Sequence, residues 1–213
     1  MQVFDVRIGG AGPAGRILAY YLGRCGIDVL LLEKKKLPRY KPCGGGLTRR
    51  TLQILPFDID AINEDRTHTA KLYVNRQLVF AKKAAQPLIA MVMRDRFDHF
   101  LVQQATKHGV ILKDQTACDR FAHQNDLIQI ETSRGLFASK LLVGADGVNS
   151  RIAHRSGLAL KTKRMIALEA ELEINRCETF DAFRHSFHFD FGVIPQGYGW
   201  VFPKLRHLSA GIL

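Results

Sequence analysis

Three glycines close to the start of the chain constrain its fold more than any other feature. They lie in the segment Gly10-Ala11-Gly12-Pro13-Ala14-Gly15, directly after the mostly apolar run from Val3 to Ile8. The apolar run predicts a buried strand, and the helical spacing from Ala14 to Cys25 predicts a helix that Gly26 ends. A second apolar run, from Ile27 to Leu32, predicts another buried strand.

This order of strand, glycine turn, helix and strand is that of a dinucleotide-binding unit. Gly10 permits a tight turn, Gly12 lets the backbone approach a pyrophosphate, and Gly15 lets the helix pack closely on the strand. The free N–H groups and the dipole of the helix N-terminus, around Ala14, attract phosphates. Glu33 follows the second run and is placed to accept hydrogen bonds from ribose hydroxyls. The alternative is a glycine turn without a ligand, but the strand, helix and acid together favour a dinucleotide site.

Arg7 is a charged residue in a strand that is otherwise expected to be buried. A strand covered on both faces is normally a continuous apolar run, and Arg7 interrupts it. Two interpretations are open. The side chain extends to solvent from near the end of the strand, or the sequence is locally destabilised.

The composition indicates a globular, intracellular protein. The chain has 213 residues, of which 46% are hydrophobic, so it can bury a large core and hold one domain or one domain with part of another. The four cysteines show no CxxC spacing, which favours a reducing cytoplasm. We expect no signal peptide and no membrane-spanning segment, because the chain starts directly with a strand and has no long apolar run. His185 and His188 are expected on opposite faces of a strand, which predicts no metal site.

The net charge of +11 favours anionic partners. The basic residues are scattered and no nucleic-acid-binding motif accompanies them, so we expect no nucleic-acid partner. The run Lys34-Lys35-Lys36 is interpreted as a solvated loop. Attraction to an anionic membrane surface that carries a lipid substrate is the alternative.

Further elements follow along the chain. We expect an irregular loop over 37–46, a short helix over 47–55, a hairpin over 68–82 that turns near Asn75, a strand over 87–93, a helix over 95–108, and strands from 110 to 143. From about residue 161 the pattern changes to strict alternation: Ile166, Leu168, Ala170, Leu172 and Ile174 alternate with Glu169, Glu171 and Glu173. This alternation predicts a strand with its glutamates toward water, at the start of an antiparallel sheet of few strands. We therefore expect one domain over 1–160, with a small inserted hairpin near 68–93, and an incomplete second domain over 161–213.

Four segments together resemble the geranylgeranyl reductase family. They are the first glycine segment, 39–46 (Arg-Tyr-Lys-Pro-Cys-Gly-Gly-Gly), 94–98 (Arg-Asp-Arg-Phe-Asp) and 144–151 (Gly-Ala-Asp-Gly-Val-Asn-Ser-Arg). That family belongs to the FAD-dependent oxidoreductases related to p-hydroxybenzoate hydroxylase. The resemblance covers essentially the whole chain. It implies an α/β fold: a Rossmann-like FAD-binding domain followed by the start of an antiparallel β substrate domain.

The resemblance also implies roles for particular residues. The FAD site would consist of Gly10, Gly12, Ala14 and Gly15 at the pyrophosphate, Glu33 at the ribose, Cys43, Gly44, Gly46 and Arg94 near the flavin, Cys118 near the adenine, and Asp146 in a second fingerprint. Cys43 is also the one candidate catalytic residue. The alternatives remain open: a flexible turn at 44–46, an inert thiol at Cys43, a surface residue at Arg94 and an ordinary turn aspartate at Asp146.

The segment 198–203 resembles the family's substrate-side signature. Strand alternation places Tyr198, Trp200 and Phe202 on one face, next to Pro203, as an apolar wall for an isoprenoid chain. Core packing is the alternative. The chain departs from the family pattern at 204–206, and at Leu213, where the family has a second glycine.

The implied reaction is the reduction of carbon–carbon double bonds in geranylgeranyl-type chains, with FAD as cofactor and NAD(P)H or ferredoxin as electron donor. The partner would be a prenyl lipid, and the protein would be cytoplasmic or peripheral at a membrane surface. A flavin monooxygenase or halogenase of the same fold is one alternative. Family members continue into a third fingerprint, so an inactive, truncated product of an interrupted gene is the other. No residue stands out in the sequence as the proton donor.

Overall fold

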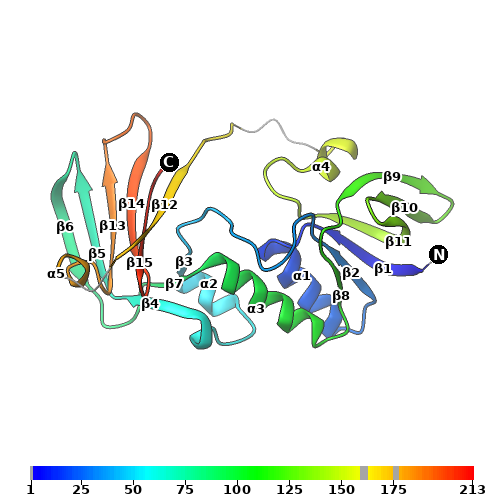
Figure 1. The fold of residues 1–213 in the computed structure, drawn as a ribbon, viewed down its shortest axis with the longest axis horizontal. Helices are drawn as coiled ribbons and strands as arrows, with labels where there is room; N and C mark the ends of the chain where they lie inside the picture. The colour runs from blue at the N-terminus through cyan, green and yellow to red at the C-terminus, as the bar shows by residue number, and fades with distance from the viewer. Residues whose placement is uncertain (1, 159–162, 175–177) are drawn as a thin grey trace. The chain divides into compact units, whose positions relative to one another are not determined.

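The computed structural model describes residues 2–158, 163–174 and 178–213 (Figure 1). The chain forms two compact units, each assembled from two stretches of sequence. The first unit comprises Met1–Arg39 and Phe97–Thr162, and the second comprises Tyr40–Arg96 and Lys163–Leu213. Within the described ranges, no helix has both the length and the apolar character needed to cross a bilayer.

The first unit begins with the predicted strand, turn, helix and strand. These are β1 (Val3–Gly9), α1 (Pro13–Arg24) and β2 (Val29–Leu32). β1 lies in the middle of a six-stranded sheet of order β8-β2-β1-β11-β10-β9 and pairs in parallel with both β2 and β11. The other elements of this unit are β8 (Ile111–Lys113), β9 (Cys118–Gln124), β10 (Leu127–Thr132), β11 (Gly135–Gly144), α4 (Arg151–Arg155) and most of α3 (Arg94–Thr106).

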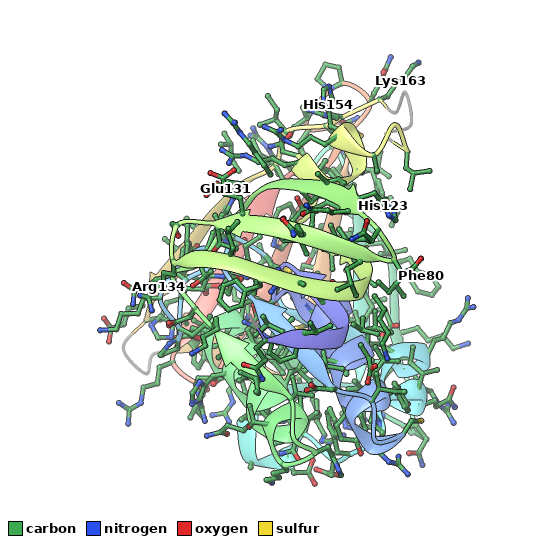
Figure 2. The ribbon with its side chains drawn as sticks, turned by 90° about the vertical axis from the view of Figure 1, so that its right-hand side faces the viewer. Phe80, His123, Glu131, Arg134, His154 and Lys163 are labelled. Carbon is green, nitrogen blue, oxygen red and sulfur yellow. The ribbon has the colours of Figure 1, made fainter. Side chains whose placement is uncertain are left out.

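Apolar side chains of the sheet and of α3 are buried in this unit. In α3, Phe97, Leu101 and Ala105 are buried, whereas Phe100 is only half-buried. On the sheet, Phe4 packs with Leu30 and Leu32, and with the partly buried Cys118 and Phe137 from β9 and β11. Figure 2 looks onto β9, β10 and β11, with His123, Glu131 and Arg134 labelled around these strands.

Arg7 does not extend to solvent as one of our interpretations expected. Its side chain is fully buried, and its guanidinium lies 4.6 Å from the centre of the Phe137 ring. All three guanidinium nitrogens lack a hydrogen-bond partner among the described residues. Burial lowers the pKa of Arg7 to about 10, so the group is still charged at neutral pH.

The second unit contains two sheets. A six-stranded sheet has the order β12-β15-β14-β13-β5-β6, and a three-stranded sheet has the order β3-β7-β4. Its strands are β3 (Gly46–Thr48), β4 (Asn63–Thr67), β5 (Thr69–Val74), β6 (Gln77–Lys83), β7 (Ile89–Val92), β12 (Leu168–Glu173), β13 (Ser186–Phe191), β14 (Tyr198–Pro203) and β15 (His207–Ile212). Three short helices complete the unit: α2 (Arg49–Ile54), η1 (Asp60–Ile62) and α5 (Glu178–Asp181).

The expected division of the chain needs one correction. The hairpin near 68–93 was assigned to the first domain, but β5 pairs in parallel with β13 and so belongs to the second unit. The reason is that β13 would otherwise leave a row of unpaired backbone groups at the edge of its sheet. The second sheet is therefore larger than the few strands expected after residue 161. The expected boundary between residues 160 and 161 lies outside the described residues.

The orientation of β12 is also the reverse of the expectation. The alternation is present, but Ile166 is 86% and Leu168 is 64% exposed, whereas Glu169 and Glu171 are half-buried. In the sheet Glu169 pairs with Gly211 and Glu171 with Ser209. Small and polar neighbours therefore leave room for the carboxylates on the inner face, which hydrophobic alternation alone cannot reveal.

Candidate functional site

The glycine turn of the first unit is closely packed at two of its three glycines. Gly10 has φ +105°, and a Cβ there would lie 2.3 Å from the carbonyl oxygen of Ala145. A Cβ on Gly15 would lie 2.0 Å from the carbonyl oxygen of Gly10. The turn therefore holds α1 tightly against β1 and places it beside the segment that follows β11.

Gly12 differs from the other two glycines because the space around it is open. It is the N-cap of α1, with extended backbone, and a Cβ there would meet no atom within 4 Å. No side chain caps the helix, and the first turn contains no acidic residue. The N–H groups around Ala14 and Gly15 at this helix end, together with the dipole, form a site suited to a phosphate group.

Glu33 lies at the carboxyl end of β2, where the sequence placed it. Its side chain is 5% exposed, and Oε1 accepts a hydrogen bond of 3.0 Å from the backbone N–H of Lys35. Oε2 lies 3.4 Å from Nη2 of Arg39. The carboxylate is therefore fixed in position and has a positive neighbour.

A buried ionic network that sequence reasoning missed supports Arg39. Its Nη1 lies 3.3 Å from Oδ2 of Asp98, and the same oxygen lies 2.9 Å from Nη1 of Arg16. Arg16 and Asp98 are fully buried, and burial lowers the pKa of Arg16 while Asp98 acts in the opposite direction. The available signal was an acid within the apolar stripe of α3, since a charge there needs a buried partner.

The segment 144–151, which contains Asp146, is held in shape by hydrogen bonds within the segment and to the start of α4. Oδ2 of Asp146 accepts hydrogen bonds from the backbone N–H groups of Arg151 at 2.7 Å and Ile152 at 3.3 Å. The hydroxyl of Ser150 donates to its Oδ1. Asp146 thus caps the start of α4 while its loop packs on Gly10. Burial raises the pKa of the nearby Cys118 thiol to about 11, so the thiol is protonated at neutral pH.

In the second unit, the glycine loop around Cys43 packs against the predicted substrate residues. Cys43 is exposed. A Cβ on Gly44 would lie 2.8 Å from Cδ2 of Phe202 and 2.9 Å from Nε1 of Trp200. Gly45 has φ +68°, and its Cβ would lie 2.1 Å from the carbonyl oxygen of Val92. The glycines are therefore required by close packing, which a flexible turn would not need. Arg94 begins α3 and is half-buried.

The alternation in β14 places the aromatic residues on one face, as the sequence predicted. The ring centres of Tyr198 and Trp200 are 6.2 Å apart, and those of Trp200 and Phe202 are 6.5 Å apart. Phe189 of β13 joins them at 5.4 Å from Tyr198. Pro203, which ends β14, is buried. Phe202 packs with Met91, so part of this face is core and part borders the glycine loop.

A buried lysine on this side of the sheet was not identified from the sequence. Lys204 is 2% exposed, and its Nζ donates a hydrogen bond of 2.7 Å to the carbonyl oxygen of Val92. Burial lowers the pKa of Lys204, while Glu171 is the largest opposing influence. The sequence showed this lysine only as part of a departure from a family pattern.

The opposite face of the sheet carries a groove. Its volume is about 720 Å³, and its lining includes Tyr73, His188, Val201 and Ala210. His188, Val201 and Ala210 pair with one another across neighbouring strands, and Val201 lies between Trp200 and Phe202 in β14, so these residues point away from the aromatic row. Glu169, Trp200 and Gly211, which lie on the aromatic face, also border this groove.

The first unit has the geometry of a dinucleotide-binding protein: a glycine turn, an open helix N-terminus and a buried acid at the end of the next strand. Comparison with known proteins identifies the dinucleotide. The chain belongs to the FAD binding domain family, whose sequence model matches residues 3–197. The family match identifies FAD as the cofactor.

The resemblance to geranylgeranyl reductases is confirmed by individual relatives. The chain is 32% identical over 211 residues to an uncharacterized protein of Methanosarcina barkeri and 26% identical over 223 residues to the digeranylgeranylglycerophospholipid reductase of Methanocaldococcus jannaschii. These matches cover 99% of this chain and 54% and 55% of the relatives, so the chain spans about half their length.

Solved structures confirm the fold. A geranylgeranyl bacteriochlorophyll reductase-like protein from Thermoplasma acidophilum has a TM-score of 0.84 at 24% identity, covering 100% of this chain and 56% of that one. The halogenase PltM, solved with phloroglucinol and FAD, has a TM-score of 0.74 at 18% identity, covering 98% and 51%. A reductase-like protein and a halogenase thus share this fold.

Proposed function

We propose that the protein takes part in the reduction of carbon–carbon double bonds in isoprenoid chains, with FAD as cofactor. The observation that carries this proposal is the aromatic row of β14 packed against the Cys43–Gly46 loop. Tyr198, Trp200 and Phe202 form an apolar wall of the kind that holds a prenyl chain. The named reductases among the relatives support the same substrate class.

The residues of the first unit fit one half of FAD. The pyrophosphate would bind at the N–H groups of Gly12, Ala14 and Gly15, where the space before α1 is open. Glu33 would accept hydrogen bonds from the adenosine ribose, and the main chain at Cys118 would lie near the adenine. When bound, FAD supplies the hydride chemistry that protein side chains lack.

The residues of the second unit would serve the flavin and the substrate. The glycine backbone at Gly44 and Gly46 suits close approach to a planar ring. Arg94 would provide a positive charge for the cofactor, and Asp146 of the first unit would hold the second fingerprint in shape. Cys43 is exposed in its loop and is the proposed catalytic thiol near the flavin. The electron donor would be NAD(P)H or a ferredoxin.

The test is a single turnover without oxygen. The FAD-loaded protein is reduced with dithionite and given geranylgeranyl diphosphate or a digeranylgeranyl glycerophospholipid. We expect oxidation of the flavin and a product heavier by two hydrogens for each double bond reduced. An unchanged substrate together with a flavin that stays reduced would contradict the proposal.

A pair of variants tests which face of the sheet holds the prenyl chain. Tyr198→Ala removes part of the aromatic wall outside the groove lining, and Val201→Ala changes the groove. We expect Tyr198→Ala to weaken prenyl-substrate binding about tenfold or more, the loss typical of a large aromatic contact. Val201→Ala is expected to bind normally. The reverse result would move the substrate to the groove.

Activation of oxygen is the second candidate, favoured by the similarity to a flavin-dependent halogenase fold. The discriminating experiment gives the reduced protein oxygen and a small phenol such as phloroglucinol. A hydroxylated product, or a halogenated one when halide is present, would support this candidate. The reductase proposal expects only reoxidation of the flavin by oxygen, with the phenol unchanged.

The net charge of +11 supports contact with an anionic membrane surface that carries the prenyl lipid. Sedimentation with vesicles that contain an anionic phospholipid tests this contact. We expect binding that weakens as salt is raised, and no binding to neutral vesicles.

A further inference from the structure

Two glutamates of β12 lie on the same face of the sheet as the aromatic row. In the strand pairing, Glu169 pairs with Gly211, and Gly211 with Trp200. One row along, Glu171 pairs with Ser209, and Ser209 with Phe202. Residues paired across neighbouring strands point to the same side. The glutamates are therefore two strands away from Trp200 and Phe202, on the side that carries the glycine loop.

The side chain of Trp200 extends toward β12 and so lies closer to the glutamates than its strand does. A Cβ on Gly211 would lie 2.1 Å from Cζ2 of Trp200, so the indole ring lies over Gly211. Gly211 is the residue next to Glu169 in the adjacent strand. The ring thus extends from β14 toward β12, and its Nε1 is buried without a hydrogen-bond partner in the described part of the chain.

The two carboxyl groups, which we call the carboxyl pair, differ in their hydrogen-bond partners. The hydroxyl of Ser209 donates a hydrogen bond of 3.3 Å to Oε1 of Glu169. Oε2 of Glu171 is buried and has no hydrogen-bond partner among the residues described. Burial is the main cause that raises the pKa of Glu171 to about 7; Glu169 raises it further, and Lys204 opposes both.

Lys204 connects the carboxyl pair to the glycine loop. Its Nζ is hydrogen-bonded to Val92 and would lie 2.6 Å from a Cβ on Gly45. The other charged or titratable groups that act on Lys204 are Cys43 and Glu64. The pKa of Tyr40 is raised mainly by burial. The carboxylates of Glu169 and Glu171 raise it further.

We propose that the carboxyl pair, with Glu171 as the acid, is the proton donor for double-bond reduction at this face. This inference rests on the proposed function. The reaction needs a hydride at one alkene carbon and a proton at the other. The π bond breaks, the hydride with its two electrons comes from reduced FAD, and the proton comes from the Glu171 carboxyl. The Glu171 carboxylate left behind regains a proton from water through Glu169.

The first test needs neither FAD nor substrate. Trp200 is the only tryptophan of the chain, so its fluorescence reports on its surroundings. We expect the emission to change with pH around a midpoint near 7, the pKa that Glu171 has in the structure. Glu171→Gln should abolish this change. Glu173→Gln is the matched control, since Glu173 is exposed in the same strand and should leave the change intact.

The second test separates proton transfer from folding and cofactor binding. In the FAD-loaded protein, Glu171→Gln should leave flavin reduction by dithionite and reoxidation by oxygen unchanged. Reoxidation by the prenyl substrate should become about 100-fold slower or more, within the usual range for loss of a general acid. In the unmodified chain the same rate should fall as the pH rises through about 7.

Several results would overturn the proposal. A fluorescence change that is absent, or that persists in Glu171→Gln, would show that the pair is only a fixed counter-charge for Lys204. Equal slowing of the oxygen and prenyl reactions in Glu171→Gln would show a structural role. If the unmodified protein fails to reduce any prenyl chain, the proposed function fails and the donor role with it. A fluorescence midpoint near 7 that Glu171→Gln abolishes would then still establish the titration of Glu171.

Discussion

At the scale of single residues, Arg7 and Glu33 show how differently a buried charge can be accommodated. Glu33 has an N–H donor and an arginine beside it. Arg7 has only the face of Phe137, with no hydrogen-bond partner among the residues that the structure describes. A buried charge without a partner destabilises a fold, whereas a partnered one at the end of a strand can serve a ligand.

Replacing Arg7 by leucine is expected to stabilise the protein. The substitution removes the desolvation cost of the charge and keeps an apolar side chain against Phe137, so we expect a gain of about 1–4 kcal/mol in the free energy of unfolding. Urea denaturation measures the gain. Arg120→Leu, in an exposed position of β9, is the control and should change little. A loss of stability in Arg7→Leu would show that the contact with Phe137 outweighs desolvation.

Replacing Glu33 by glutamine is expected to weaken FAD binding about tenfold, or about 1.4 kcal/mol, because a charged acceptor for the ribose hydroxyls becomes neutral. The dissociation constant of FAD, from flavin fluorescence, measures the effect. Lys34→Gln changes an exposed neighbour and should bind FAD normally. An unchanged affinity in Glu33→Gln would remove Glu33 from the proposed ribose site.

At the scale of elements, the glycine turn separates packing from ligand binding. Gly15 is in contact with the backbone of Gly10, whereas Gly12 faces open space. The same substitution at these two positions therefore tests different properties. In the second unit, the orientation of β12 determines the surroundings of two carboxylates. It places Glu169 and Glu171 on the inner face of the sheet, where they are half-buried.

Gly15→Ala and Gly12→Ala are expected to affect different properties, the first stability and the second FAD binding. Gly15→Ala forces α1 away from the turn and should cost about 1–3 kcal/mol of unfolding free energy, as overpacking does. Gly12→Ala should keep the thermal midpoint of the unmodified protein and weaken FAD binding about tenfold, because its methyl group would occupy the proposed pyrophosphate site. Thermal unfolding and FAD titration measure both. Normal FAD affinity in Gly12→Ala would argue against that site.

At the scale of the whole molecule, two buried groups of the second unit make stability depend on pH in opposite directions. Burial is the main cause that raises the pKa of Glu171 from 4.5 to about 7. The stability that this group contributes is complete below pH 4.5 and is lost as the pH rises through 7. Burial is also the main cause that lowers the pKa of His188 from 6.5 to about 4. Its contribution is complete above pH 6.5 and is lost as the pH falls through 4.

The free energy of unfolding should therefore change little between pH 4.5 and 6.5, because the two contributions oppose each other. In Glu171→Gln only the His188 contribution remains, so stability should rise steadily with pH across this range. Urea denaturation at several pH values measures it, with Glu173→Gln as control. A flat profile in Glu171→Gln would contradict the assignment of the raised pKa to Glu171.

Much of the first unit follows from local sequence. The turn needs glycine at Gly10 because of a positive φ, and β2 is an apolar run because both faces of the strand are covered. In the second unit, the predicted hairpin that turns near Asn75 is also present. Asn75 and Arg76 adopt positive φ in the turn between β5 and β6. These features depend on residues close to each other in the sequence.

Tertiary structure decided the rest. The sequence by itself determined the glycine turn, the acid at Glu33 and the aromatic alternation of β14, because each is a local pattern with one physical solution. It did not determine that β5 joins β13, that Arg39 and Asp98 support Glu33, or that β12 turns its glutamates inward. Those arrangements depend on which distant segments pair and which charges are buried together. Strand pairing and desolvation involve residues far apart in the sequence, so a local sequence pattern does not show them.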